Sequence, residues 1–304
     1  MGVRVQSKEG IVWKVIRALG IYLHVVKSRS LGFIAFQVLF CLAIYSQSLF
    51  GATYYTRGVG GNWNSTSTWS TVSCNGAIAA TIPGAGDDVV ICNSSGASAV
   101  TVTVNGVFAC RDLIIGTGGA NATIQTSNAA YSLTVHGDVS FNQGNESFVY
   151  TLSASSGTVN LLGDVIWNSV NGTNRFLVST GNITFNNDIA ITQDNQQITF
   201  SNIGKVYFLG NFEDSQNNLY TYAGCSVIFS GNYTITGEMA HWNTTASMVF
   251  NGLSSVIQAD EELRNGKLIV KTGAGLTILE SLGAVTLGSI ALESSTQLTI
   301  NHAC

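Results

Sequence analysis

The chain has 304 residues, of which 10% are charged and 45% are hydrophobic, with one proline and a formal net charge of −4. This composition excludes a disordered chain, because apolar residues for a core are plentiful. It also argues against a nucleic-acid partner, because no cluster of Lys or Arg is present to neutralise phosphates. The negative charge belongs to residues 53–304, since residues 1–52 carry six Lys or Arg and one Glu.

Residues 1–52 have the pattern of a leader. A basic stretch precedes an apolar run at 31–45, and small and polar residues follow as far as Ala52. This order is typical of a signal peptide, so we expect cleavage near Ala52 and a secreted or cell-surface protein. The alternative is a membrane anchor, for which the run is short, because a span needs about 20 residues. Residues 1–24 exceed an ordinary leader and indicate a start codon assigned too early.

Residues 53–115 differ from the rest of the body and are predicted to form an N-terminal β cap. Trp63 and Trp69 lie six residues apart, a spacing that places both on one face of a strand. Core packing is the ordinary role of such a pair, and a platform for sugar stacking is the alternative. Asp87 and Asp88 follow a Pro-Gly turn, where we expect solvated carboxylates or, as the alternative, a Ca²⁺ site; no other cofactor is expected.

Three cysteines of the cap, Cys74, Cys92 and Cys110, are spaced 18 residues apart. Export would permit a disulfide between two of them, but the sequence does not select the pair. The alternative is that they are small buried hydrophobic residues. A metal site is not expected, because neither a CxxC nor an HxxxH spacing occurs.

A glycine recurs along the body, each time near a short apolar strand. The positions are Gly116, Gly137, Gly163, Gly210, Gly231, Gly252 and Gly273, with Asn187 filling the long interval between Gly163 and Gly210. The local sequence repeats as well, as LTVHGDV, VNLLGDV, ITFNNDI, VYFLGNF, VIFSGNY and MVFNGLS. A fixed period of 20 to 50 residues is the mark of a stacked repeat.

The repeat predicts an all-β fold, a right-handed parallel β-helix (solenoid) over residues 116–304. Each unit holds about three short strands with the alternation of a pleated strand. We expect Gly and Asn at the corners because these residues tolerate positive φ, and apolar residues to form a continuous buried column. The alternative is an antiparallel β-sandwich, which also alternates strands and turns.

Two parts of the sequence resemble known families. The text TWS…TIPGAGDDVVI…VTVNGVFACRDLIIG resembles the eight-glycine domain family, through Trp69-Ser70, Pro83 to Asp87 and Leu113 to Gly116. The later repeats are similar to those of secreted adhesin-like surface proteins of gliding bacteria of the Bacteroidetes type, through Phe250 to Gly252 and Leu268 to Val270. The resemblance implies a β-helical protein exported to the cell outer membrane. Such proteins usually end in a C-terminal sorting domain, so we expect a truncated chain whose membrane contact is limited to the leader or a missing C-terminal anchor.

The sequence offers few catalytic candidates. Asp87-Asp88 and Asp260 to Glu262 are the acidic clusters, and neighbours in a strand point to opposite faces, so neither forms a ready catalytic pair. A polysaccharide lyase would need a basic residue near acidic groups. The available bases, for which solvated surface is the ordinary role, are Arg175, Lys205, Arg264, Lys267 and Lys271.

We therefore expect a non-enzymatic, adhesin-like binding or spacer module rather than an enzyme. Its expected partner is an extracellular polysaccharide or another cell-surface protein, held on flat faces by aromatic residues such as Tyr220, Tyr222 and Trp242. The alternative is a β-helical carbohydrate-active enzyme, a polysaccharide lyase or glycoside hydrolase, in which acidic and basic residues of several coils converge in one groove. A third hypothesis is a pure stalk whose binding part lies beyond residue 304.

Overall fold

The structure, a computed structural model, describes residues 51–301 apart from a set of short segments. These segments are 93–98, 118–120, 143–148, 168–172, 178–179, 192–196, 202–203, 215–218, 236–239, 243–245, 260–262, 265–266, 281–284 and 287–288. Residues 51–304 form one compact unit. The predicted leader lies outside the described residues. Among those described, no helix is long and apolar enough to cross a membrane.

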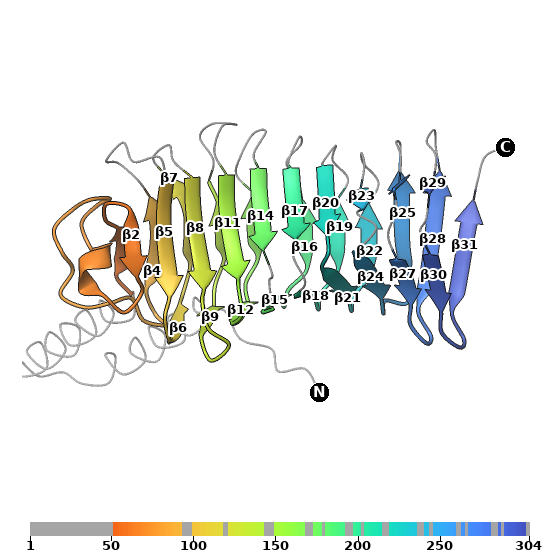
Figure 1. The fold of residues 1–304 in the computed structure, drawn as a ribbon, viewed down its shortest axis with the longest axis horizontal. Helices are drawn as coiled ribbons and strands as arrows, with labels where there is room; N and C mark the ends of the chain where they lie inside the picture. Colours follow the sequence, from red (N-terminus) through yellow and green to blue (C-terminus); the bar gives the residue numbers. More distant parts are fainter. Residues whose placement is uncertain are drawn as a thin grey trace, which may run out of the picture. The chain divides into compact units, whose positions relative to one another are not determined.

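The described chain is all β, apart from the single 3-10 turn η1 (Thr66–Thr68). Its strands stack along one axis (Figure 1), and every pairing between them is parallel except that of β1 with β3. The prediction of a parallel β-solenoid is confirmed, and the antiparallel sandwich is wrong. Each full coil contributes one strand to each of three faces in turn, as the sequence period predicts.

Two faces are continuous sheets. Sheet B consists of β2 (Gly60–Asn62), β5 (Ala99–Val104), β8 (Asn121–Thr126), β11 (Val149–Ala154), β14 (Thr173–Leu177), β17 (Gln197–Ser201), β20 (Leu219–Ala223), β23 (Ala240–Trp242), β26 (Leu263–Arg264) and β29 (Val285–Thr286). Sheet C consists of β6 (Val107–Cys110), β9 (Ser132–Val135), β12 (Thr158–Leu161), β15 (Asn182–Phe185), β18 (Lys205–Phe208), β21 (Ser226–Phe229), β24 (Ser247–Phe250), β27 (Lys267–Val270) and β30 (Ser289–Leu292).

The third face is divided into two sheets. Sheet A consists of β3 (Trp69–Ser70), β1 (Thr53–Thr56), β4 (Asp88–Cys92), β7 (Leu113–Thr117), β10 (Val139–Phe141) and β13 (Val165–Trp167). Sheet D consists of β16 (Ile189–Ile191), β19 (Phe212–Asp214), β22 (Tyr233–Ile235), β25 (Ser255–Ala259), β28 (Gly275–Glu280) and β31 (Gln297–Asn301). The strands β13 and β16 are neighbours but do not pair, so the ladder is interrupted between them.

The core is a set of columns that run from coil to coil. In many strands, such as β12, β15 and β21, alternate residues point inward and are buried. In sheet C, the phenyl rings of Phe185, Phe208, Phe229 and Phe250 stack with centroids 4.7, 5.0 and 5.6 Å apart. Parallel pairing in register places identical side chains one above another, which explains why the apolar residues repeat in the sequence once per coil.

The predicted cap, 53–115, joins the same ladders as the repeats. Its strands β4, β5 and β6 pair in parallel with β7, β8 and β9. What distinguishes it is the antiparallel partner β3, which covers the outer edge of β1. This strand reversal protects the first coil, because an exposed strand edge is open to pairing with other chains.

Five of the recurrent glycines lie at one corner, but not for the predicted reason. None of Gly137, Gly163, Gly210, Gly231 and Gly252 has a positive φ, unlike Gly116 and Gly273, which lie outside this column. A Cβ on Gly163 would lie 2.1 Å from the Gly137 carbonyl oxygen, and one on Gly231 would lie 2.3 Å from that of Gly210. Glycine recurs there because successive corners approach too closely for a side chain.

Candidate functional site

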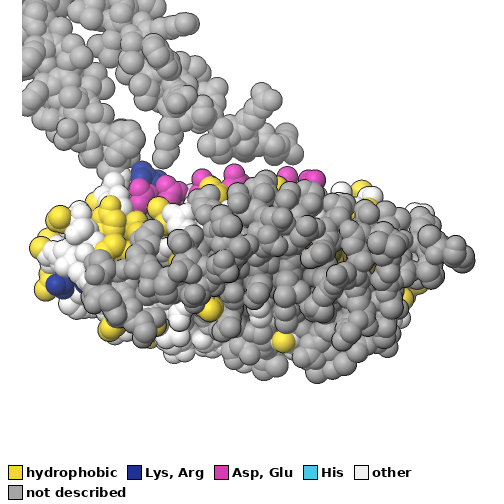
Figure 2. Space-filling view, turned by 90° about the horizontal axis from the view of Figure 1, so that it is seen from above, with side chains coloured by type: hydrophobic (Ala, Val, Ile, Leu, Met, Phe, Trp, Pro, Cys, Tyr) yellow, Lys and Arg dark blue, Asp and Glu magenta, His cyan; other side chains and the backbone are white. Residues whose placement is uncertain are grey.

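A ladder of side-chain hydrogen bonds follows the glycine corner. Asp112 Oδ1 accepts a bond from the backbone N–H of Asp138 at 2.9 Å, and Asp138 Oδ1 accepts one from Asp164 at 3.1 Å. Further along, Asp188, Asn211 and Asn232 each accept a bond from the next coil, at 2.7, 2.9 and 2.9 Å. At each of these steps, one side-chain oxygen joins a corner to its successor. Figure 2 shows a row of acidic side chains along one edge.

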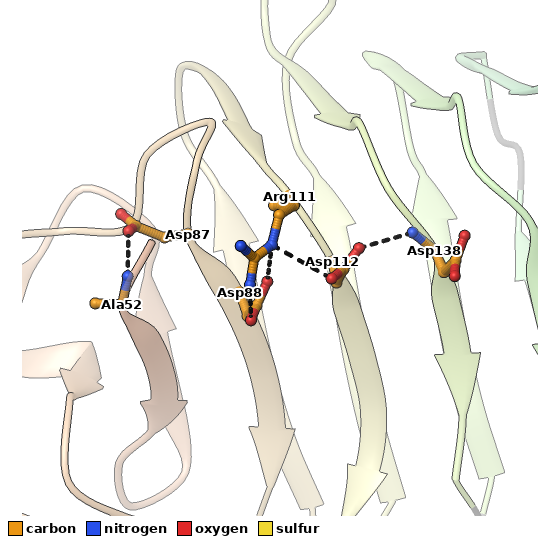
Figure 3. A network of polar contacts seen from close by, with 6 residues as sticks. All are labelled: Ala52, Asp87, Asp88, Arg111, Asp112 and Asp138. Carbon is orange, nitrogen blue, oxygen red and sulfur yellow. Dashed lines mark hydrogen bonds and ion pairs between the residues drawn. The ribbon is translucent and has the colours of Figure 1, made fainter. Parts of the chain in front are cut away.

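The ladder begins at a charged cluster (Figure 3). Asp87 accepts hydrogen bonds from the backbone of Ala52 and Gly84, at 2.8 and 2.9 Å. Asp88 pairs with the guanidinium of Arg111, which also lies 3.4 Å from Asp112 Oδ2. The bond with Asp88 raises the pKa of Arg111 above its ordinary value.

These contacts bear on the alternative of a Ca²⁺ site at Asp87 and Asp88. Both carboxylates already have protein partners, the one at a turn and the other at Arg111. Within the described part of the chain, no group of three or more His, Cys, Asp or Glu side chains is placed to hold a metal ion. The geometry therefore offers Asp87 and Asp88 a structural role at the start of the ladder.

The corner ladder breaks at one step, between Asp164 and Asp188. On both sides, a strand's first N–H bonds to the corner carbonyl of the next coil, as from Val139 to Asp164 at 2.8 Å and from Ile189 to Asn211 at 2.7 Å. The corresponding bond from Val165 to Asp188 is missing among these described residues. The side-chain bond from the Asp188 N–H to Asp164 Oδ1 is missing as well, and Asn187 Nδ2 approaches that oxygen instead, at 3.3 Å.

The break coincides with the one corner of the column from Gly137 to Gly252 where glycine is replaced. The register places Asn187 between Gly163 and Gly210, as the sequence predicts. Asn187 carries the Cβ for which the glycine corners leave no room. We infer that this side chain keeps the corner from closing onto Gly163, and that the lost closure separates β13 from β16.

A groove of about 540 Å³ lies at this break. Its lining comes from the corners and strands of three successive coils and consists of Asp164, Val165, Ile166, Trp167, Asp188, Ile189, Ala190, Asn211 and Glu213. The volume is within the usual range of small-molecule sites, about 300–1,000 Å³. The groove therefore lies where the ladder is interrupted, and polar groups line it.

The lining carries three carboxylates and no basic side chain among the described residues. Asp164, Asp188 and Glu213 are exposed, and the ladder occupies only one oxygen of each aspartate. Trp167 is only 5% exposed, and its indole N–H is buried and has no hydrogen-bond acceptor. An unpaired buried donor costs about 1–3 kcal/mol, and this one lies on the inward side of β13, because Trp167 alternates with the outward Ile166.

The predicted sugar platform at Trp63 and Trp69 is wrong, because both residues are fully buried. Their rings contact edge to face at 5.1 Å, and Trp63 also stacks on Phe108. The Trp69 indole donates to the Trp63 carbonyl at 2.8 Å. Core packing, the ordinary role expected of such a pair, holds, since the pair fills the first coil and offers no face to a ligand.

Tyr220, Tyr222 and Trp242 lie at register positions of the core. Tyr220 is in the column of Tyr150, and Tyr222 and Trp242 are in the column of Leu152. Both Tyr150 and Leu152 are fully buried. The side chains of the three candidates lie outside the described part of the chain, so the binding face stays a prediction.

Two of the three cap cysteines form a disulfide, which is one of the predicted alternatives. Cys74 and Cys92 form a disulfide, whereas Cys110 is a buried free thiol in sheet C. Burial raises the pKa of the Cys110 thiol above its ordinary value. The disulfide ties the turn after β3 to β4, and Cys110 is part of the core.

The basic candidates for catalysis lie on other faces. Arg175 and Arg264 are in sheet B, and Lys205 and Lys267 are in sheet C. Lys271 follows β27 and pairs with Glu293. The acidic cluster at 260–262 lies outside the described residues. Arg111, which was not among these candidates, contacts the acidic corner ladder.

The groove residues were missed by reasoning from the sequence. The signal was present, because Asp follows the corner position in HGDV, LGDV and NNDI, and because Asn187 stands where glycine is expected. What the period did not reveal is that a substitution at a crowded corner would interrupt one ladder and leave the other two intact.

Comparison with known proteins adds no relative to this description: no family model, no curated protein and no solved structure matches the chain.

Proposed function

We propose that the protein is a non-enzymatic, adhesin-like binding and spacer module that acts outside the cell or at its surface. The observation that carries the proposal is the combination of two uninterrupted sheets with one local break. Sheets B and C continue past the point where sheets A and D separate, so the groove is held open on a hydrogen-bonded support. A site on a rigid scaffold binds with less ordering cost than a flexible loop does.

The secreted location is supported by the sequence rather than by the fold. The order of basic, apolar and small residues before Ala52 favours export, and the disulfide between Cys74 and Cys92 is typical of an oxidising compartment. The resemblance to Bacteroidetes-type adhesin-like repeats points the same way. Fractionation of the source cells, with N-terminal sequencing of the mature chain, is expected to find a processed start near residue 53 in the extracellular or surface fraction.

The enzymatic alternative is favoured by one observation, the three carboxylates that line the groove. Two carboxyl groups are the usual machinery of glycoside hydrolysis. A lyase also needs a basic residue beside the acidic ones, and the described lining of the groove contains neither Lys nor Arg. We therefore place binding ahead of turnover.

A paired assay separates the two functions. The purified protein is incubated with immobilised polysaccharides and with intact cells, and retention is measured together with the release of reducing ends and of unsaturated sugar products. The proposal predicts retention without release. Release that disappears in Asp188→Asn would contradict the non-enzymatic function and support the enzyme.

A further inference from the structure

We propose that the groove between β13 and β16 binds a short segment of a neutral polysaccharide. The proposal rests on the binding function above and names its ligand class. Its physical basis is that the groove offers both donors and acceptors, together with a floor of aliphatic carbon. A sugar presents the same three features, since each hydroxyl donates and accepts and the ring carries C–H groups.

The donors are two N–H groups left unpaired by the interrupted ladder. The Val165 N–H lacks the carbonyl bond that Val139 and Ile189 make, and the Asp188 N–H lacks the side-chain bond that joins the other corners. Both residues line the groove. A hydroxyl oxygen placed between the strands would satisfy a donor that is otherwise desolvated, and this recovers part of the cost of its burial.

The acceptors are the free carboxylate oxygens on the rim. Asp164 and Asp188 each use Oδ1 within the corner, and Oδ2 has no hydrogen bond to the described protein. Glu213 lies one coil beyond Ala190 in the same outward column and is exposed. Hydrogen bonds from neutral hydroxyls to ionised carboxylates are stronger than those between neutral groups.

The floor between these groups is aliphatic. Ile166 of β13 is 37% exposed, and Ala190 of β16 is exposed at the middle of its strand. Both point outward, because the residues on either side of them are buried. The floor gives the C–H face of a sugar ring an apolar surface, while the rim engages the hydroxyls at its edge.

The same groups disfavour other ligands. An acidic polysaccharide would place its charges against three carboxylates, an unfavourable contact between like charges. A metal ion would engage the carboxylates but leave the two N–H donors unpaired, and a lysine-rich peptide would place charged side chains against the aliphatic floor. A neutral glycan is the class that uses the donors, the acceptors and the floor together.

The first test blocks the groove without touching the core. Titration calorimetry compares the purified full-length chain with Ala190→Trp against neutral gluco-, manno- and galacto-oligosaccharides. The matched control is Thr277→Trp, a change at the same outward column four coils further along. We expect at least one neutral oligosaccharide to bind, and its affinity to fall at least tenfold in Ala190→Trp but less than twofold in the control.

A second variant tests the unpaired donors. Asn187→Gly removes the side chain that keeps the corner open, so the N–H groups of Val165 and Asp188 are expected to regain their partners. We expect a several-fold weaker affinity for the oligosaccharide. An affinity that stays unchanged when both amides become protected would show that these donors do not bind the ligand.

The outcomes separate this inference from the proposed function. Glycan binding that survives in Ala190→Trp would overturn the groove as the site while leaving a binding module in place. Preference for alginate, for polylysine or for Ca²⁺ over every neutral oligosaccharide would overturn the ligand class. The absence of binding to any neutral oligosaccharide would overturn the inference as well, whereas release of reducing ends would overturn the non-enzymatic function itself.

Discussion

The corners before and after the break form the same hydrogen bond with different acceptor residues. Before it, the acceptor in the corner ladder is an aspartate, as in Asp112 and Asp138, and after Asp188 it becomes an asparagine, as in Asn211 and Asn232. The bond lengths are alike, at about 3 Å on both sides. The comparison teaches that the corner requires an acceptor oxygen and a small neighbour, whereas charge is free to vary along the column.

The corner bond therefore does not explain the negative charge of the aspartates before the break. Asp138, Asp164 and Asp188 repeat once per coil, and stacked strands lie about 4.8 Å apart. Like charges this close oppose one another, and the described basic residue on this edge, Arg111, reaches only Asp88 and Asp112. Of the three uncompensated carboxylates, those of Asp164 and Asp188 reach the groove, which is consistent with a binding role for them.

The largest expected effect tests the steric demand that the two sides share. Gly231→Ala would place a Cβ 2.3 Å from the Gly210 carbonyl oxygen, and Gly163→Ala would place one 2.1 Å from that of Gly137. We expect each to lose about 3 kcal/mol of unfolding free energy, because backbone cannot yield as a side chain can. Urea unfolding measures the loss.

The matched control for the corner glycines is Gly86→Ala, where a Cβ would meet nothing within 4 Å. We expect this change to alter the unfolding free energy by less than about 0.5 kcal/mol. Equal losses in Gly231→Ala and Gly86→Ala would show that the corner column is not limited by close approach.

A second prediction concerns Tyr150, which lies before the break. Its hydroxyl donates to the Gly116 carbonyl at 3.1 Å, and burial raises its pKa to about 12. Above pH 10 the unfolded chain releases this proton before the folded chain does, so stability present below pH 10 declines toward pH 12. Urea midpoints across this range are expected to fall less in Tyr150→Phe than in the wild type, and parallel curves would contradict the assignment.

A smaller effect compares the two acceptors directly. Asp138→Ala and Asn211→Ala each remove the oxygen that binds the next corner, at an expected cost of about 1 kcal/mol. Asp138→Asn and Asn211→Asp keep an oxygen at the same place and are expected to cost less than half as much. Thermal melts of the four variants provide the measurement. Losses in the exchanged pair as large as those in the alanine pair would show that charge, not the acceptor, sets the ladder.

The sequence predicts the solenoid well because its cause is local and repeated. A strand that alternates and a corner that recurs identify the coil, and Asn187 takes the predicted place of a glycine. The predicted reason for glycine at these corners, a positive φ, was wrong, and the reason is the close approach of successive corners. Composition cannot distinguish them, because both conditions favour glycine.

The functional residues were harder to predict for a related reason. Trp63 and Trp69 are conspicuous in sequence but bury their rings, because a bulky pair fills an end coil as readily as it binds a sugar. Asp188 and Glu213 are inconspicuous because they come from different coils and meet only after stacking. A single exception to a repeat proved more informative than the aromatic residues.

The central claim is that Asn187, by replacing a corner glycine, interrupts the third ladder. Amide hydrogen exchange followed by NMR in the wild type and in Asn187→Gly tests it most directly. If the claim holds, the N–H groups of Val165 and Asp188 exchange freely in the wild type and become protected at least tenfold in the variant, as the missing corner bonds form. Val165 and Asp188 amides that are already protected in the wild type, or that remain unprotected in Asn187→Gly, would contradict it.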